Sequence, residues 1–355
     1  MSPADRTPQH SASVLEYLGR LYAEEGREHA CWAKTPTGVA AWQSVARPAL
    51  RRLLGLERMA LELREHQPAV ELGDTEDLRD CTRQAGHIET EPDVRIPFWL
   101  LKPKQRGRRP LAVMPHGHEA RGFDTYAGVS RSEEHYRQRI VEREADVAVQ
   151  AARRGFIAIA PNTRGFEPSY VPDLNKRHGD RHCRSQLIHC LLAGRTVIGE
   201  RVWDVQRIID WAVTLPDVDP GRILVMGNSG GGVCTTYAAA CDTRVTVAVP
   251  SCSFATYVGE NGLVHHCDCN TVPGILSFGE FSDVAGLIAP RPLLIVNGKA
   301  DTLFPLSEVD RAVAGVQAIY AAAGQPERFA HRYGPKGHQF YGDIMWPFVE
   351  EAMRG

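Results

Sequence analysis

The 355 residues suffice for one to three domains, and 43% hydrophobic with 24% charged residues is ordinary for a globular protein that dissolves in water. A formal net charge of −2 gives no long-range attraction for nucleic acid or an anionic membrane surface, so we expect neither partner. No stretch of the sequence approaches the ~20 apolar residues that a membrane-spanning helix needs.

The amino terminus and the cysteines indicate the compartment. Residues 1–8 are polar and lack the apolar core of a secretory signal. The nine cysteines are an odd number, and two of them, Cys234 and Cys241, fall on a predicted helix where buried thiols are common. We therefore expect free thiols and a cytoplasmic protein rather than a disulfide framework.

The first predicted elements are helices. Apolar residues recur with helical spacing over residues 13–24 and 41–56, which predicts two amphipathic helices. We expect residues 1–90 to form a helical extension packed on a core that spans 91–355. Strand character begins near residue 94, and Pro97 places the strand over 96–101 near a sheet edge or at a strand start.

A second strand, over residues 110–114, is followed by the loop Pro-His-Gly-His-Glu at 115–119. Gly117 permits a tight bend directly after the strand. Two histidines and a glutamate this close together are also compatible with metal binding, which stays an alternative for His116, His118 and Glu119.

Further along the chain, residues 164–167 and 175–184 form a loop-rich region that can line a pocket. For Arg164 we favour a structural role, in which it pairs with a buried carboxylate such as Asp204 on the predicted helix 197–213. The polar run 131–143 interleaves arginines with glutamates, which is typical of a solvated helix face rather than a nucleic-acid site.

The sequence Gly-Asn-Ser-Gly-Gly at 227–231 lies between an apolar strand pattern, 222–226, and a helix pattern, 233–240. Glycines on both sides of Ser229 let the backbone turn sharply from strand to helix and present the hydroxyl above the sheet. This pattern predicts a nucleophile elbow with Ser229 as nucleophile.

A serine hydroxyl needs a histidine to accept its proton and a carboxylate to orient that histidine. Asp301 follows the predicted buried strand 292–296, and His338 lies in a Gly/Pro loop after the predicted strand 328–333. All three residues fall at the carboxyl ends of strands, where active sites form in open α/β sheets. We therefore predict Ser229, Asp301 and His338 as a catalytic triad.

Acyl transfer also requires donors for the oxyanion of the tetrahedral intermediate. One donor is expected from the backbone N–H of Gly230, directly after the nucleophile. The other is expected from the backbone N–H of His118 in the loop 115–119.

The predicted connection between the strand 245–250 and Asp301 contains His-His-Cys-Asp-Cys at 265–269. These residues could seed a zinc site, but a second ligand pair at the usual spacing is not evident nearby. Further ligands from another loop are possible, namely His178, His182, Cys183 and His189. We favour an insertion near 252–290 that shapes the substrate pocket, and we expect no metal and no cofactor.

Several of these motifs resemble the α/β-hydrolase superfamily: the elbow at 227–231, the loop 115–118, and the sequences at 160–165 and 288–294. Within it, the sequence is similar to the acetyl xylan esterase, dienelactone hydrolase and prolyl oligopeptidase-like branch over about residues 90–350. The resemblance implies an eight-stranded, mostly parallel sheet with helices on both faces. It departs from dienelactone hydrolases, which have cysteine where Ser229 stands, and from many deacetylases, which have glutamine where Gly230 stands.

Together these features predict a serine carboxylester hydrolase that works through an acyl-enzyme. The resemblance favours small-molecule esters with short, acetyl-like acyl groups on sugars or small alcohols. Two alternatives remain open: a peptidase of the prolyl oligopeptidase-like branch, and a non-catalytic binding protein on a hydrolase scaffold. The peptidase branch normally carries a β-propeller, for which about 90 residues of helical lead-in are too few.

Overall fold

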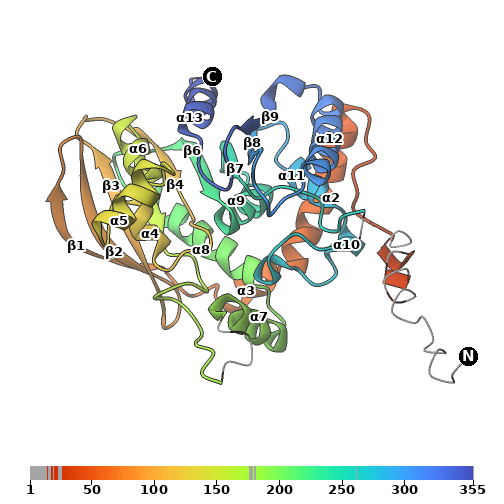
Figure 1. The fold of residues 1–355 in the computed structure, drawn as a ribbon, viewed down its shortest axis with the longest axis horizontal. Helices are drawn as coiled ribbons and strands as arrows, with labels where there is room; N and C mark the ends of the chain where they lie inside the picture. The colour runs from red at the N-terminus through yellow and green to blue at the C-terminus, as the bar shows by residue number, and fades with distance from the viewer. Residues whose placement is uncertain are drawn as a thin grey trace, which may run out of the picture.

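The computed structural model describes residues 14, 17–18, 20–22, 26–175, 179, 181–260 and 262–354. Within them, nine strands form one sheet in the order β1-β2-β3-β5-β4-β6-β7-β8-β9 (Figure 1). The pairs β1–β2, β2–β3 and β3–β5 are antiparallel, and the pairs from β5 through β4 to β9 are parallel. The predicted mostly parallel α/β sheet is confirmed.

The strands are β1 (Ala69–Asp77), β2 (Cys81–Glu91), β3 (Val94–Pro103), β4 (Arg109–Val113), β5 (Ile157–Pro161), β6 (Val218–Asn228), β7 (Val247–Ser251), β8 (Leu293–Gly298) and β9 (Phe329–Gly334). The longer helices are α2 (Pro36–Leu53), α7 (His182–Ala193), α8 (Val197–Ala212), α9 (Gly230–Cys241), α12 (Leu306–Ala322) and α13 (Gly342–Ala352). Shorter ones are α3 (Leu56–Glu62), α4 (Gly122–Tyr126), α5 (Glu133–His135), α6 (Val147–Arg153), α10 (Ile275–Phe278) and α11 (Phe281–Gly286), with the π-helix η2 (Tyr136–Val141) and the 3₁₀ turns η3 (Asp268–Asn270) and η4 (Pro326–Arg328).

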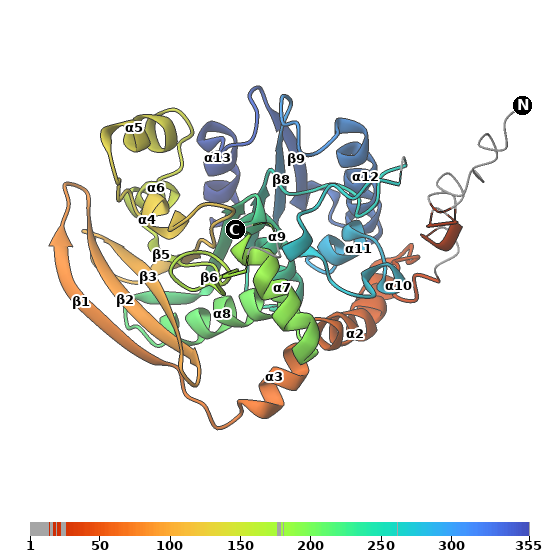
Figure 2. The same ribbon diagram turned by 60° about the horizontal axis from the view of Figure 1, so that its bottom comes forward.

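Helices cover both faces of the sheet (Figures 1 and 2). Alternate residues of one strand explain why: Ile223 and Val225 of β6 join the apolar cluster under α2, α8, α9 and α12, whereas Leu224 and Met226 join the cluster under α6 and α13. Side chains alternate between the faces of a strand, so an unbroken apolar run requires cover on both sides.

The amino-terminal region differs from expectation in two ways. The range 1–90, expected to be helical, contains β1 and all of β2 except its last residue, Glu91. The sheet has nine strands rather than the expected eight. Strand β1 is an edge strand whose side chains are nearly all exposed, so its sequence carries no apolar alternation that could reveal it. Of the predicted helix 13–24, residues 14, 17–18 and 20–22 are described, and all of them are helical.

The predicted helix 41–56 is present but begins earlier and divides into α2 and α3. Thr35 caps the start of α2 with its side chain, and Pro36 occupies the first turn. Gly55, with φ of 82°, separates the two helices. Arg47 of α2 donates to the carbonyls of Ala240 and Leu287 at 2.8 and 2.6 Å, which attaches α2 to the ends of α9 and α11.

The connection from β7 to β8, residues 252–292, contains η3, α10 and α11. Helix α11 packs against α9 and α12, so the connection is anchored to the core at its carboxyl-terminal end. Its earlier part lies over the carboxyl edge of the parallel strands and contributes His265, His266 and Cys267 to the pocket described below. Within the described residues, no helix combines the length and apolarity required to cross a bilayer.

Candidate active site

Ser229 occupies a sharp turn between β6 and α9. Its φ of 58° and ψ of −126° are sparsely populated for a residue with a side chain, as expected of a nucleophile elbow. The Ser229 N–H donates to the carbonyl of Ser251 on β7 at 2.8 Å, which fixes the turn on the neighbouring strand. A Cβ atom at Gly231 would lie 2.0 Å from the carbonyl oxygen of Pro115, so this position requires glycine.

Asp301 and His338 meet on the same side of the sheet. His338 Nδ1 lies 2.7 Å from Asp301 Oδ2, and the other carboxylate oxygen accepts from the Leu303 N–H at 3.0 Å. The Asp301 side chain is 1% exposed and that of His338 is 25% exposed. The carboxylate is therefore held by both oxygens, and the imidazole remains accessible from the pocket.

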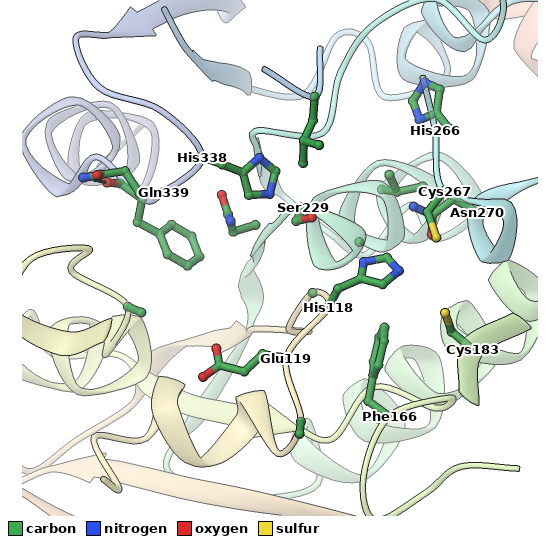
Figure 3. Close-up of a pocket in the computed structure, with 18 of the residues that line it drawn as sticks. His118, Glu119, Phe166, Cys183, Ser229, His266, Cys267, Asn270, His338 and Gln339 are labelled. Carbon is green, nitrogen blue, oxygen red and sulfur yellow. Dashed lines mark hydrogen bonds between the residues drawn. The ribbon is translucent and has the colours of Figure 1, made fainter. Parts of the chain in front are cut away.

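Ser229 and His338 line one pocket of about 720 Å³ at the carboxyl edge of the parallel strands. In Figure 3 the His338 ring stands next to Ser229 at the centre of this pocket. The structure thus brings together, from the loops after β6, β8 and β9, the three residues that the sequence predicts as a triad.

The loop after β4 lies directly on the elbow. A Cβ atom at Gly117 would be 2.6 Å from the Asn228 carbonyl oxygen and 2.9 Å from Ser229 Cβ, so the two backbones touch. The next residue, His118, and Gly230, the first residue of α9, both line the pocket beside Ser229. The N–H groups in the first turn of a helix have no partner within the helix, which leaves that of Gly230 available to an oxyanion.

The three side chains weighed as metal ligands in this loop point to different places. His116 is fully buried, with Nδ1 donating to the Gly117 carbonyl at 2.8 Å and Nε2 accepting from the Thr163 N–H at 3.0 Å. Burial lowers the pKa of His116 to about 4, so the ring is neutral. Glu119 pairs with Arg139 and His135, while His118 turns toward Cys269.

Arg164 lies in a buried cluster of charged groups. Its Nε donates to Asp204 at 3.0 Å and its Nη1 to Glu91 at 2.6 Å. Burial disfavours the charge of Arg164, but Asp204 and Glu200 outweigh it and raise the pKa of the guanidinium. The favoured structural role of Arg164, pairing with Asp204, agrees with these contacts.

The side chains of the cysteine-rich segment 265–269 also point to two different places. His266 is buried against Phe281 and Phe304, its Nε2 faces the carbonyl of Ala255 at 3.3 Å, and burial lowers its pKa to about 4. Cys267 and Cys269 instead point toward Cys183 of α7 and His118 of the loop after β4, and the four ligand atoms lie within 4.8 Å of one another. Of the other weighed ligands, His178 lies outside the described residues, and His182 stacks on Tyr170.

Cys252, which the sequence did not single out, lies beside the predicted triad, and its sulfur is within 4.8 Å of the ligand atoms of Asp301 and His338. Burial first, and the Asp301 carboxylate second, raise the pKa of this thiol to about 12. The neutral thiol faces the carbonyl of Gln339 at 3.4 Å. A buried thiol that stays protonated is not a reactive nucleophile, and this group fits a packing role.

Two sequence comparisons match part of this chain to known proteins. The sequence profile of the family described as "Acetyl xylan esterase (AXE1)" matches residues 134–258, which include the elbow. The relative named "Putative hydrolase YtaP", from Bacillus subtilis (strain 168), is 30% identical over 166 residues, or 45% of this chain. The match covers 56% of that relative, so this chain spans just over half of its length.

Solved structures of other proteins have a similar fold over nearly the whole of this chain. The structure of "a putative acetyl xylan esterase (BF1801)" from Bacteroides fragilis NCTC 9343 has a TM-score of 0.75 at 17% identity, covering 99% of this chain and 97% of that one. A glucuronoyl esterase from Solibacter usitatus has a TM-score of 0.64 at 15% identity, covering 92% and 97%. The chain has the α/β-hydrolase fold of these esterases, and its residues 134–258 are similar to those of acetyl xylan esterases.

Proposed function

We propose that this protein is a serine carboxylester hydrolase that cleaves short-chain, acetyl-like esters of sugars or small alcohols through an acyl-enzyme. The observation that carries the proposal is that Ser229 and His338 line one pocket, with Asp301 behind His338 holding Nδ1 of the imidazole at 2.7 Å.

In the proposed mechanism Nε2 of His338 accepts the Ser229 proton while the serine oxygen attacks the ester carbonyl. Asp301 holds the proton on Nδ1 and stabilises the imidazolium that forms. The N–H groups of Gly230 and His118 stabilise the oxyanion, and the protonated His338 then donates to the leaving alcohol. Water attacks the acyl-enzyme by the same steps, with His338 again as general base.

The substrate class is proposed from the relatives and the pocket. The comparison proteins are named as acetyl xylan and glucuronoyl esterases, whose names refer to esters of carbohydrates. The pocket, about 720 Å³, has room for a sugar-sized alcohol, and Glu119, Arg139 and Gln339 offer polar groups along its wall. The cytoplasmic location expected from the sequence stays a prediction.

A panel of esters that varies the acyl chain and the alcohol tests the proposal, with p-nitrophenyl acetate and acetylated sugars included. Hydrolysis of the acetyl esters is expected, and Ser229→Ala abolishes it while circular dichroism shows an unchanged fold. Ser307→Ala, which alters an exposed serine at the start of α12, serves as the matched control and keeps full activity.

The same panel separates the alternatives. A peptidase would cleave chromogenic peptides faster than esters, and a binding protein would cleave neither and would leave Ser229 unlabelled by a fluorophosphonate probe. Full esterase activity in Ser229→Ala would show that the assignment of the nucleophile is wrong.

A further inference from the structure

Four side chains that can bind a soft metal ion converge at one end of the pocket. His118 comes from the loop after β4, Cys183 from the first turn of α7, and Cys267 and Cys269 from the connection between β7 and β8. Cys183 and Cys269 are buried, Cys267 is half-buried, and His118 faces the pocket. Figure 3 shows His118, Cys183 and Cys267 pointing toward the same space.

We propose that His118, Cys183, Cys267 and Cys269 bind one zinc ion, which ties the loop that carries the oxyanion donor to α7 and to the β7–β8 connection. Three thiolates and one imidazole with no open position are a structural zinc set. Soft sulfur ligands select zinc over magnesium, calcium or manganese, which prefer oxygen.

The distances between the ligand atoms suit a tetrahedral ion. Zinc–sulfur and zinc–nitrogen bonds of about 2.3 and 2.0 Å place neighbouring ligand atoms about 3.5 to 3.8 Å apart in a tetrahedron. Cys267 Sγ lies 3.7 Å from Cys269 Sγ, and His118 Nε2 lies 3.3 Å from Cys269 Sγ. A disulfide requires sulfur atoms at about 2.05 Å, and all three cysteines are free.

The charged groups around the four ligands are also compatible with a bound zinc ion. Three thiolates, a neutral imidazole and Zn²⁺ leave one net negative charge, and the buried guanidinium of Arg201 lies beside it. Arg201 Nη1 is 3.6 Å from Cys269 Sγ, and its Nη2 has no hydrogen-bond partner among the described residues. Asp268, which accepts from the Cys269 N–H, is paired with Arg184, so its charge is offset separately.

The position of the cluster gives the ion a consequence for catalysis. The backbone N–H of His118 is the second oxyanion donor in the proposed function, and its ring lies against Gly230, where an added Cβ atom would be 3.2 Å from His118 Nδ1. A metal on Nε2 would therefore fix both the ring and the peptide of residue 118. The metal would act by positioning this donor, not by contacting the substrate.

The first test measures the metal without reference to activity. The full-length protein is produced in medium supplied with zinc, purified without chelators, and analysed by inductively coupled plasma mass spectrometry. About one zinc per chain is expected. Protein stripped of metal and titrated with Co²⁺ is expected to show thiolate-to-cobalt charge transfer together with the visible bands of tetrahedral cobalt. A chain that holds no zinc and gives no such spectrum would overturn the proposal.

Matched variants locate the ion. Cys267→Ser and the double variant Cys267→Ser/Cys269→Ser are expected to lose zinc. Cys31→Ser, which alters another half-buried thiol that lines a different pocket, is expected to keep it. Zinc that remains at full occupancy in the folded double variant would contradict the assignment. So would a disulfide among Cys183, Cys267 and Cys269, found by peptide mapping under non-reducing conditions.

A kinetic measurement tests the positioning role. Loss of an oxyanion donor lowers kcat by about 10²–10³, and loss of its support is expected to lower kcat by roughly tenfold to a hundredfold with KM little changed. Cobalt restored to the stripped enzyme should recover the rate. If the protein binds zinc at this site but hydrolyses no ester, the proposed function is wrong and the zinc site is supported. If the protein hydrolyses esters but binds no zinc, the zinc site is wrong and the proposed function is supported.

Discussion

At the scale of single residues, the two oxygens of Asp301 have different partners, and each has a separate effect. Oδ2 holds Nδ1 of His338, which keeps the free electron pair of the ring on Nε2, facing the pocket. Oδ1 accepts from the Leu303 N–H, which prevents the carboxylate from rotating away. The tautomer and the orientation of the general base thus depend on one buried side chain.

We expect Asp301→Asn to lower kcat by about 10³–10⁴, because an amide that donates to Nδ1 stabilises the wrong tautomer of His338. The fold should persist, since the amide oxygen still accepts from the Leu303 N–H. Steady-state kinetics on p-nitrophenyl acetate measure the effect, and Asp310→Asn, which alters an exposed carboxylate bonded to Tyr333, is the control. A loss of less than tenfold would remove Asp301 from the triad.

Gly117 is the contact between the oxyanion loop and the elbow. An added methyl group would lie 2.6 Å from the Asn228 oxygen, so Gly117→Ala must displace one of the two backbones. We expect kcat to fall by about 10²-fold, the order of magnitude of a lost oxyanion donor, with a smaller change in KM.

Gly73→Ala provides the comparison for this substitution, because a Cβ at Gly73 would meet its nearest neighbour, the Ala85 oxygen, at an ordinary 3.5 Å. Both proteins are compared by kcat, KM and melting temperature. Wild-type kcat in Gly117→Ala would show that the loop does not depend on this close approach.

At the scale of elements, the buried charges around Arg164 connect β2, the loop after β5, and α8. Arg164 contacts Glu91 at the end of β2 and Asp204 in the middle of α8. Arg195, two residues before α8, reaches Glu91 at 2.8 Å. Ions taken out of water are tolerated only when each keeps its partners. The loop after β5, which supplies Phe166 to the pocket, is therefore fixed by charge pairing rather than by apolar packing alone.

Arg164→Met should destabilise the protein by about 3–5 kcal/mol, because it removes the cation that pairs with the buried Asp204 and one of the two arginines that pair with Glu91. Urea unfolding followed by fluorescence measures the change. Arg95→Met removes an exposed pair with Glu71 and should cost less than about 1 kcal/mol. An Arg164→Met protein as stable as the wild type would mean that these carboxylates become solvated or protonated at little cost.

Elements with a strong local signal could be predicted from the sequence. The apolar runs of β6 and β8 and the glycines of the elbow determine strands and a turn through nearby residues. The triad prediction needed only the ends of those strands and of β9. Strand β1 could not be predicted, since its exposed, acidic residues acquire strand geometry only by pairing with β2. His118 and Cys269, 151 residues apart, meet only through tertiary packing, so their shared site had no spacing to reveal it.

At the scale of the whole molecule, the amino-terminal segment, α11 and the β7–β8 connection join around two carboxyl groups, one buried (Asp283) and one half-buried (Glu280). Asp283 accepts from the Cys31 N–H at 2.8 Å, and Glu280 accepts from the Tyr257 N–H at 2.9 Å. The two residues also form the capping box of α11. Segments far apart in the sequence thus share one polar junction, which fixes the connection that forms one wall of the pocket.

This junction predicts how stability depends on pH. Burial raises the pKa of Glu280 to about 7 from a usual value of 4.5, although the Tyr257 N–H and Arg27 oppose the rise. Between these two values the folded protein retains a proton that the unfolded chain releases, so the free energy of unfolding falls as the pH rises through this window. Burial also raises the pKa of Asp283, which adds to the same slope.

We expect Glu280→Gln to flatten this slope. At about pH 8, where the half-buried wild-type carboxylate is charged, the variant should be more stable than the wild type by on the order of 1–3 kcal/mol. Urea unfolding at a series of pH values from about 5 to 8 measures it. Glu327→Gln, which alters an exposed carboxyl group on η4, should keep the wild-type slope. Because Asp283 remains, the free energy of unfolding of Glu280→Gln should still depend weakly on pH. A pH dependence equal to that of the wild type would show that Glu280 is ionised in the folded protein at no cost, and that the junction tolerates two charges.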